Sequence, residues 1–191
     1  MNYLKGDNYG KRKEGVAKRF EEKLSEYSRK HRHLKFIGYC LPDISFNGKE
    51  FSKEIYFNDA TFYGVVDFDS AIFSRVAKFD TATFSKAAQF SNTTFYELAS
   101  FSRAAFSGVA IFFSARFSGV ANFDTANFES FASFNNTKVL DKADFHGAFS
   151  ITSCMIISIN TYYQCYLACL RHNNIFNYPQ KLSFMVRLNY R

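Results

Sequence analysis

Residues 57–79 read FNDATFYGVVDFDSAIFSRVAKF, and the spacing between successive phenylalanines in this stretch alternates between five and six. The alternation continues without a break to residue 134. The phenylalanines that keep it are Phe57, Phe62, Phe68, Phe73, Phe79, Phe84, Phe90, Phe95, Phe101, Phe106, Phe112, Phe117, Phe123, Phe128 and Phe134. Two residues before nearly every one stands a small side chain, usually alanine. The unit is therefore an eleven-residue repeat, and each unit can bury its apolar side only against its neighbours.

This repeat predicts a four-sided β-solenoid. If the chain turns a corner every five or six residues, each side carries one inward phenylalanine with a small residue beside it. Stacked coils then place the phenylalanines in four columns, which begin at Phe57, Phe62, Phe68 and Phe73. Rings repeated at the strand spacing of about 4.8 Å can stack on one another. A supercoiled helix of the same period is disfavoured, because the repeat is rich in Phe, Ser, Thr and Asn.

The units at 82–85, 121–124 and 126–129 read ATFS, ANFD and ANFE. They resemble the pentapeptide-repeat family, whose units read small residue, Asp or Asn, Leu or Phe, Ser or Thr, then any residue. The resemblance runs from about Leu41 to Phe149 and implies an all-β fold, a right-handed quadrilateral parallel β-helix. Every second unit here has a sixth residue, which should introduce a bulge on alternate faces.

Three segments are expected along the chain: a charged N-terminal helical segment (1–36), the pentapeptide-repeat β-helix (37–149), and a C-terminal cap with a basic tail (150–191). Within the first segment, residues 11–33 carry a narrow apolar stripe at Val16, Phe20, Leu24 and Tyr27, which is typical of an amphipathic helix. Such a helix would cover the open edge of the first coil.

The two ends of the repeat are less regular than its middle. Ile44, Lys49 and Ile55 occupy positions that are small elsewhere, so we expect the first coil to be wider or partly irregular. After Phe149 the pattern fades. We expect a helix over 161–172 that docks on the last coil, and a degraded extra coil is the alternative.

The net charge of +7 resides in the ends of the chain. Lys and Arg outnumber Asp and Glu by eleven to six in 1–43 and by four to none in 150–191, whereas 44–149 holds nine against eleven. A basic cluster follows the expected helix and consists of Arg29, Lys30, His31, Arg32, His33 and Lys35. It either complements the helix dipole or binds nucleic acid or an anionic membrane.

No enzyme motif is present, and we expect neither a catalytic site, nor a cofactor, nor a small-molecule substrate. Cys165, Cys169 and His172 could share one face of a helix and bind zinc, but three ligands without a partner pair favour buried thiols. No basic start followed by an apolar run precedes the repeat, so a cytoplasmic protein is expected.

The leading functional hypothesis is a non-enzymatic scaffold that presents the faces of its β-helix to another protein. Tyr63, Tyr96 and Phe113 each follow a core phenylalanine directly, so they are expected to face outward and to form the contact surface. The apolar C-terminal cap is a possible homodimer surface. The alternatives are association of the basic ends with nucleic acid or an anionic membrane, or, as the family resemblance implies, DNA mimicry that modulates DNA gyrase.

Overall fold

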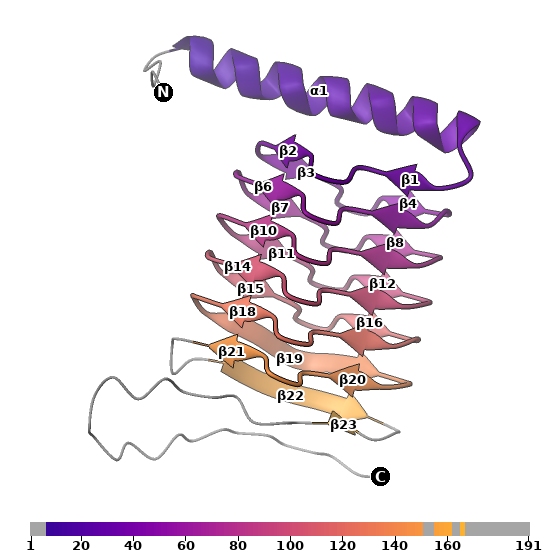
Figure 1. Ribbon diagram of the computed structural model, residues 1–191, viewed down its shortest axis with the longest axis vertical. Helices are drawn as coiled ribbons and strands as arrows, with labels where there is room; N and C mark the ends of the chain where they lie inside the picture. The colour runs from indigo at the N-terminus through magenta and orange to yellow at the C-terminus, as the bar shows by residue number, and fades with distance from the viewer. Residues whose placement is uncertain (1–6, 151–154, 162–164, 167–191) are drawn as a thin grey trace.

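The computed structural model describes residues 7–150, 155–161 and 165–166, and the side chains of residues 15–148. One helix, α1 (Asp7–Lys30), is followed by a parallel β-solenoid of about five turns. Figure 1 shows the coils stacked beneath α1, which lies across the N-terminal end of the stack. Helix and solenoid thus have the predicted order along the chain.

Strands of successive coils pair in parallel and line up as four faces. Face 1 contains β1 (Leu34–Lys35), β5 (Ile55–Tyr56), β9 (Ala77–Lys78), β13 (Ala99–Ser100), β17 (Ala121–Asn122), β20 (Ala143–Asp144) and β23 (Cys165–Tyr166). Face 2 contains β2 (Cys40–Leu41), β6 (Thr61–Phe62), β10 (Thr83–Phe84), β14 (Ala105–Phe106), β18 (Asn127–Phe128) and β21 (Phe149–Ser150).

The other two faces are joined at their C-terminal end. Face 3 contains β3 (Ile44–Ser45), β7 (Val66–Asp67), β11 (Ala88–Gln89) and β15 (Ala110–Ile111), and face 4 contains β4 (Glu50–Phe51), β8 (Ile72–Phe73), β12 (Thr94–Phe95) and β16 (Arg116–Phe117). The longer strand β19 (Ala132–Val139) continues both faces, and β22 (Met155–Thr161) pairs along it.

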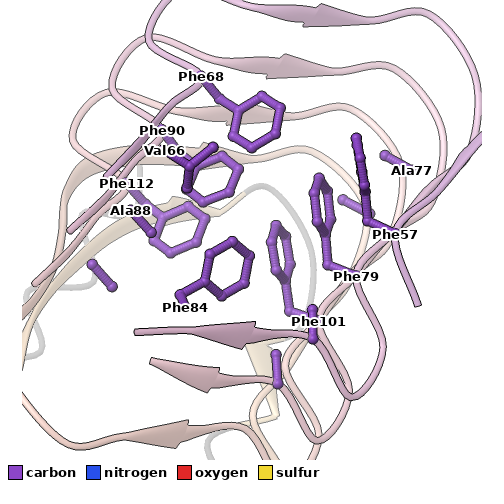
Figure 2. Close-up of a cluster of buried hydrophobic side chains, with 14 of the residues drawn as sticks. Phe57, Val66, Phe68, Ala77, Phe79, Phe84, Ala88, Phe90, Phe101 and Phe112 are labelled. Atoms are coloured by element: carbon purple, nitrogen blue, oxygen red, sulfur yellow. The ribbon is translucent and has the colours of Figure 1, made fainter. Parts of the chain in front are cut away.

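The core is formed by the phenylalanine columns that the repeat predicts. All fifteen phenylalanines of the regular series, Phe57 to Phe134, are buried. Within a column the rings stack; the Phe79 and Phe101 centroids, for example, lie 4.9 Å apart with the planes 3° from parallel. Rings of opposite columns meet edge to face across the core, as Phe101 and Phe112 do at 85° (Figure 2). Both geometries are preferred by aromatic quadrupoles.

A tight turn recurs every eleven residues and sets the corners inside the five-residue units. In the first regular turn, the Ala60 amide donates to the Phe57 carbonyl over 3.1 Å, and Asp59 has a φ of 57°. Positive φ at the third residue alone is the pattern of a type II turn. The same conformation occurs at Asp59, Ser70, Thr81, Asn92, Arg103, Ser114, Thr125 and Asn136.

The bulge predicted on alternate faces is not present among the described strand pairs. Their register shifts only between Asn135 and Thr137, where β19 pairs with β22. The sixth residue causes no mismatch because it recurs at the same two corners in each regular coil. When every coil has the same insertion at the same place, the paired strands of neighbouring coils stay in register.

The solenoid begins at Leu34, inside the segment 1–36 that was assigned to the helical region. The helix ends at Lys30 because Leu34 and Phe36 already fill the small and the phenylalanine positions of face 1. The Lys53 ammonium donates to the carbonyls of Ser28 and His31, both over 2.7 Å, and so caps the helix. The first coil is partly irregular, as expected, but it is shorter and not wider. Its strands pair with those of the second coil at an offset of 21 residues on faces 1 and 2 and of 22 residues on faces 3 and 4, because the unit from Leu41 to Phe46 lacks the sixth residue.

Helix α1 packs its apolar stripe on the first coil. Phe20 and Leu24 are buried, and the Phe20 ring lies 4.7 Å from that of Phe36. This packing closes the N-terminal end of the phenylalanine columns, as predicted.

The helix expected over 161–172 is wrong where the structure describes that range. Residues 155–161 form β22, and Cys165–Tyr166 form β23 in register with Ala143 and Asp144 of β20. The degraded extra coil is therefore the correct alternative for these residues. Backbone pairing with the preceding coil satisfies donors and acceptors that a docked helix would leave open. Residues 167–172 lie outside the described part of the chain.

Phe101 tests the stacked core, because its ring lies between those of Phe79 and Phe123 and its side chain is fully buried. Phe101→Ala should lower the free energy of unfolding by about 3 to 5 kcal/mol through the cavity that it leaves. Denaturant unfolding of both proteins measures the difference. Phe113→Ala, at an exposed ring, is the control and should cost much less. Equal losses would contradict the stacked-core account.

Thr125 tests the cost of the turns. A β-branched residue is strained at its φ of 53°, whereas asparagine tolerates this region. Thr125→Asn should therefore raise the free energy of unfolding by roughly 1 kcal/mol. Thr83→Asn, within strand β10, is the matched control and should not stabilise. A gain at both positions would show that the effect does not come from the turn conformation.

Candidate interaction surfaces

An apolar stripe runs along the corner between faces 2 and 3. It consists of Val65, Ala87, Val109 and Phe131, one residue from each of four successive coils. Backbone bonds hold them in line: the amides of residues 66, 88 and 110 donate to the carbonyls of Ala87, Val109 and Phe131 over 2.8 to 3.0 Å. Val65 and Val109 are exposed, and the other two are partly buried.

The stripe widens on the coil that contains β15. Val109, Ile111 and Phe113 alternate with the buried Ala110 and Phe112, so all three point away from the core. Phe113 is 43% exposed, which is unusual for so large an apolar side chain. We call Val65, Val109, Ile111, Phe113 and Phe131 the apolar patch. It extends across face 3, from the border with face 2 at Val109 to the border with face 4 at Phe113.

The three residues predicted to form the contact surface do not come together. Tyr63 follows β6 on face 2, Phe113 follows β15 on face 3, and Tyr96 follows β12 on face 4. Tyr96 and Phe113 are exposed, whereas Tyr63 is partly buried. Only Phe113 belongs to the apolar patch.

The residue after each phenylalanine identifies only Phe113 of the apolar patch. A second signal is present in the sequence: the residue before the small one in each six-residue unit is apolar throughout the regular repeat. The residues are Val65, Val76, Ala87, Leu98, Val109, Val120 and Phe131, eleven apart. The coil register divides them between two opposite corners, and Val109 is the one that Ile111 and Phe113 extend.

Face 4 carries an outward column whose charge changes sign along the stack. In register, the column reads Glu50, Ile72, Thr94, Arg116 and Lys138. The single acid lies near the helix end, and both bases lie toward the opposite end. Arg116 and Lys138 are direct cross-strand neighbours, an arrangement that is unfavourable between like charges.

Face 1 carries a mildly acidic column, Asn58, Asp80, Ser102 and Asp124. Its carboxylates accept hydrogen bonds from side chains of neighbouring coils. The Asn58 amide donates to Asp80 over 3.1 Å, and Ser100 also bonds to that carboxylate. Farther along, His146 lies 3.3 Å from Asp124. Lys78 interrupts the column's acidic character on the same face. These carboxylates are therefore partly neutralised within the solenoid.

The predicted basic cluster lies where α1 meets the first coil. Lys30 pairs with Glu26 over 2.7 Å, and the His33 ring lies 2.7 Å from Glu54. Arg29, Arg32 and Lys35 are exposed, and none has a carboxylate partner among the side chains of residues 15–148. Arg29 and Arg32 still act at longer range on Glu26 and Glu54, whose pKa values they help to lower. Three exposed cations outside direct ion pairs therefore remain there for an external anion.

Glu54 joins this cluster to face 1. The Tyr56 hydroxyl donates to the Glu54 carboxylate over 2.6 Å, and this bond is the main reason that the pKa of Glu54 lies below its ordinary value. The charge of His33 lowers it further, whereas burial acts in the opposite direction. The same bond raises the pKa of Tyr56.

The described residues form neither a metal-binding cluster nor a membrane-spanning helix. These residues contain no group of three or more His, Cys, Asp or Glu side chains arranged to hold a metal ion. The zinc candidates Cys165, Cys169 and His172 lie outside the described side chains. Over the same part of the chain, no helix has both the length and the apolar character needed to cross a bilayer.

Comparison with known proteins supports the family resemblance. The family model for pentapeptide repeats (9 copies) matches residues 68–115, which cover the turns and columns at the centre of the solenoid. This match confirms the resemblance read from the repeat units. Comparison with curated proteins and with solved structures gave no match.

The bond between Tyr56 and Glu54 predicts a pH dependence. A carboxyl whose pKa is lowered by folding stabilises the folded state above its ordinary value of 4.5, and this contribution disappears as the pH falls through the lower value. Tyr56→Phe should therefore lower the Tm at pH 7, and its deficit should shrink below pH 4.5. Thermal unfolding from pH 7 to pH 3 measures this. A deficit that is constant over the range would mean that Tyr56 acts through packing instead.

Proposed function

We propose that this pentapeptide-repeat β-helix is a non-enzymatic cytoplasmic scaffold that binds a protein partner through the apolar patch. The observation that carries the proposal is the clustering of Val109, Ile111 and Phe113 on one exposed edge of the solenoid. Exposed apolar residues that occur singly need no explanation, whereas a contiguous group with an aromatic side chain favours a binding surface.

The rigidity of the underlying core supports this role. Val109 and Phe113 lie on either side of Ala110 and Phe112, which are fully buried. Backbone bonds to the coils before and after fix the same segment. A partner that docks there would order few additional groups, and the entropic cost of binding would be low.

The absence of an inserted loop favours a role without catalysis. From Phe57 to Phe134 each unit has five or six residues, so no segment projects far enough to assemble a site. The carboxylates Asp80 and Asp124 recur by register and are bonded to their neighbours. Catalysis needs titratable groups that converge in a concave site. The repeating carboxylates of face 1 do not support such an arrangement.

A second candidate is association with nucleic acid or an anionic membrane through the basic cluster. The exposed charges of Arg29, Arg32 and Lys35 favour it. Binding of this kind would weaken steeply as salt is raised. No comparable observation favours gyrase mimicry, because the acidic column on face 1 is short and internally bonded. A supercoiling assay with and without the protein decides that alternative.

The proposed patch is tested by affinity capture from host lysate, with and without nuclease. A protein partner that resists nuclease should be captured by the full chain and lost, at least about tenfold, with Val109→Ser/Phe113→Ser, since core hot-spot truncations cost 1 kcal/mol or more each. Ile37→Ser, at another exposed apolar residue, is the matched control and should retain the partner. Retention by the double variant would refute the patch.

A parallel sample distinguishes the second candidate. Capture that disappears with nuclease, or with Arg29→Glu/Arg32→Glu, would place the binding activity in the basic cluster. Charge substitutions are preferable to deleting residues 1–43, because β1 and β2 belong to the first coil and their loss would uncover its core.

A further inference from the structure

From the outward column of face 4, we propose that the protein forms a homodimer in which two copies pack this face antiparallel about a two-fold axis at Thr94. The column has five members, Glu50, Ile72, Thr94, Arg116 and Lys138, and one lies on each of five successive coils. This inference rests on other residues than the proposed function, apart from Phe113, which lies at the margin of both surfaces.

The charged members of the column form no ion pair with the side chains that the structure describes. Glu50, Arg116 and Lys138 are exposed, and none has an ion pair among the side chains of residues 15–148. Glu50 only accepts a 3.3 Å hydrogen bond from the Ser74 hydroxyl. Arg116 and Lys138 are in direct register, so each also bears the repulsion of the other. A carboxylate placed opposite these two bases would relieve that repulsion.

The column is complementary in charge to a second copy of itself that runs in the opposite direction. Glu50 and Lys138 are equally distant from Thr94, two coils away on either side. A two-fold axis at Thr94 therefore places Glu50 of one copy opposite Lys138 of the other, and does so twice. It also places Ile72 opposite the long aliphatic stem of Arg116. Such an isologous contact closes on itself and ends with two copies.

Aromatic side chains border the column on both sides. Tyr96 is 56% exposed and follows the strand that contains Thr94, and Phe113 is 43% exposed and precedes Arg116. Among the described side chains they are the only exposed large aromatics. Tyrosine and phenylalanine are enriched in interface cores. A second copy on face 4 would shield Tyr96 beside the axis and Phe113 at the margin.

Charge reversal tests the pairing directly, because both residues are exposed and the variants keep the core. The molar mass of the purified full chain is measured at low ionic strength by light scattering and sedimentation. The wild type should be a dimer. Glu50→Lys and Lys138→Glu should each raise the dimer Kd at least about tenfold, since each places two like-charge pairs in the interface. Circular dichroism checks that each variant is folded.

Recombining the reversed charges gives the decisive result. An equimolar mixture of Glu50→Lys and Lys138→Glu should dimerise again, because each interface then contains two opposite pairs. The double variant Glu50→Lys/Lys138→Glu should also be a dimer. Lys86→Glu, an exposed reversal at the corner between faces 2 and 3, is the control and should leave the dimer unchanged.

Several outcomes would overturn the proposal. A wild type that is monomeric at the highest concentration measured would refute it. A dimer that withstands both single reversals would place the contact on another surface, such as the C-terminal cap. Single variants that weaken association without rescue in the mixture would show that Glu50 and Lys138 do not face each other. The capture experiment tests the apolar patch separately, because Val109 lies at the corner between faces 2 and 3, away from the dimer contact.

Discussion

Stacking of phenylalanine rings at the strand spacing is the constraint on which the rest of this structure depends. A ring that must lie about 4.9 Å from the next, as Phe79 and Phe101 do, fixes each coil directly over its neighbour. That distance is nearly the spacing of paired strands, so one geometry satisfies the rings and the backbone together. The edge-to-face contact of Phe101 with Phe112 then joins opposite columns across the centre of one core.

The backbone bears a cost for this regularity at its corners. In the regular repeat the five-residue units bring successive phenylalanines inward by turning through positive φ, and residues such as Thr81 and Arg103 adopt it without the freedom of glycine. The bonds between coils hold these residues in place. The chain can therefore vary its turn residues widely while the core remains the same, because the conformation is imposed by neighbours rather than by local preference.

Most of the fold could be read from the sequence, because periodic burial is a local property of the repeat. The four columns and the covering helix followed from spacing alone. The start at Leu34 was missed because leucine there takes the place of the small residue, and the strand at Cys165–Tyr166 was missed because its coil has lost the phenylalanine signal. The apolar patch was missed in part, since side chains such as Val65 and Val109 become neighbours only in the coil register.

The same regularity decides where function can reside. Every coil buries nearly the same side chains, so the inward residues cannot distinguish one face or one end from another. Only the outward columns differ, and they differ in kind. On face 1, residues such as Asn58 and Ser100 donate hydrogen bonds to a carboxylate of the same face. This internal bonding makes the face a weaker site for a partner that binds by charge alone. Face 3 exposes apolar groups, and face 4 keeps Glu50 and Lys138 apart at a distance set by the coil spacing. Because the stack holds Glu50 and Lys138 four coils apart, these two residues can pair with each other only between molecules, as in the dimer that we propose.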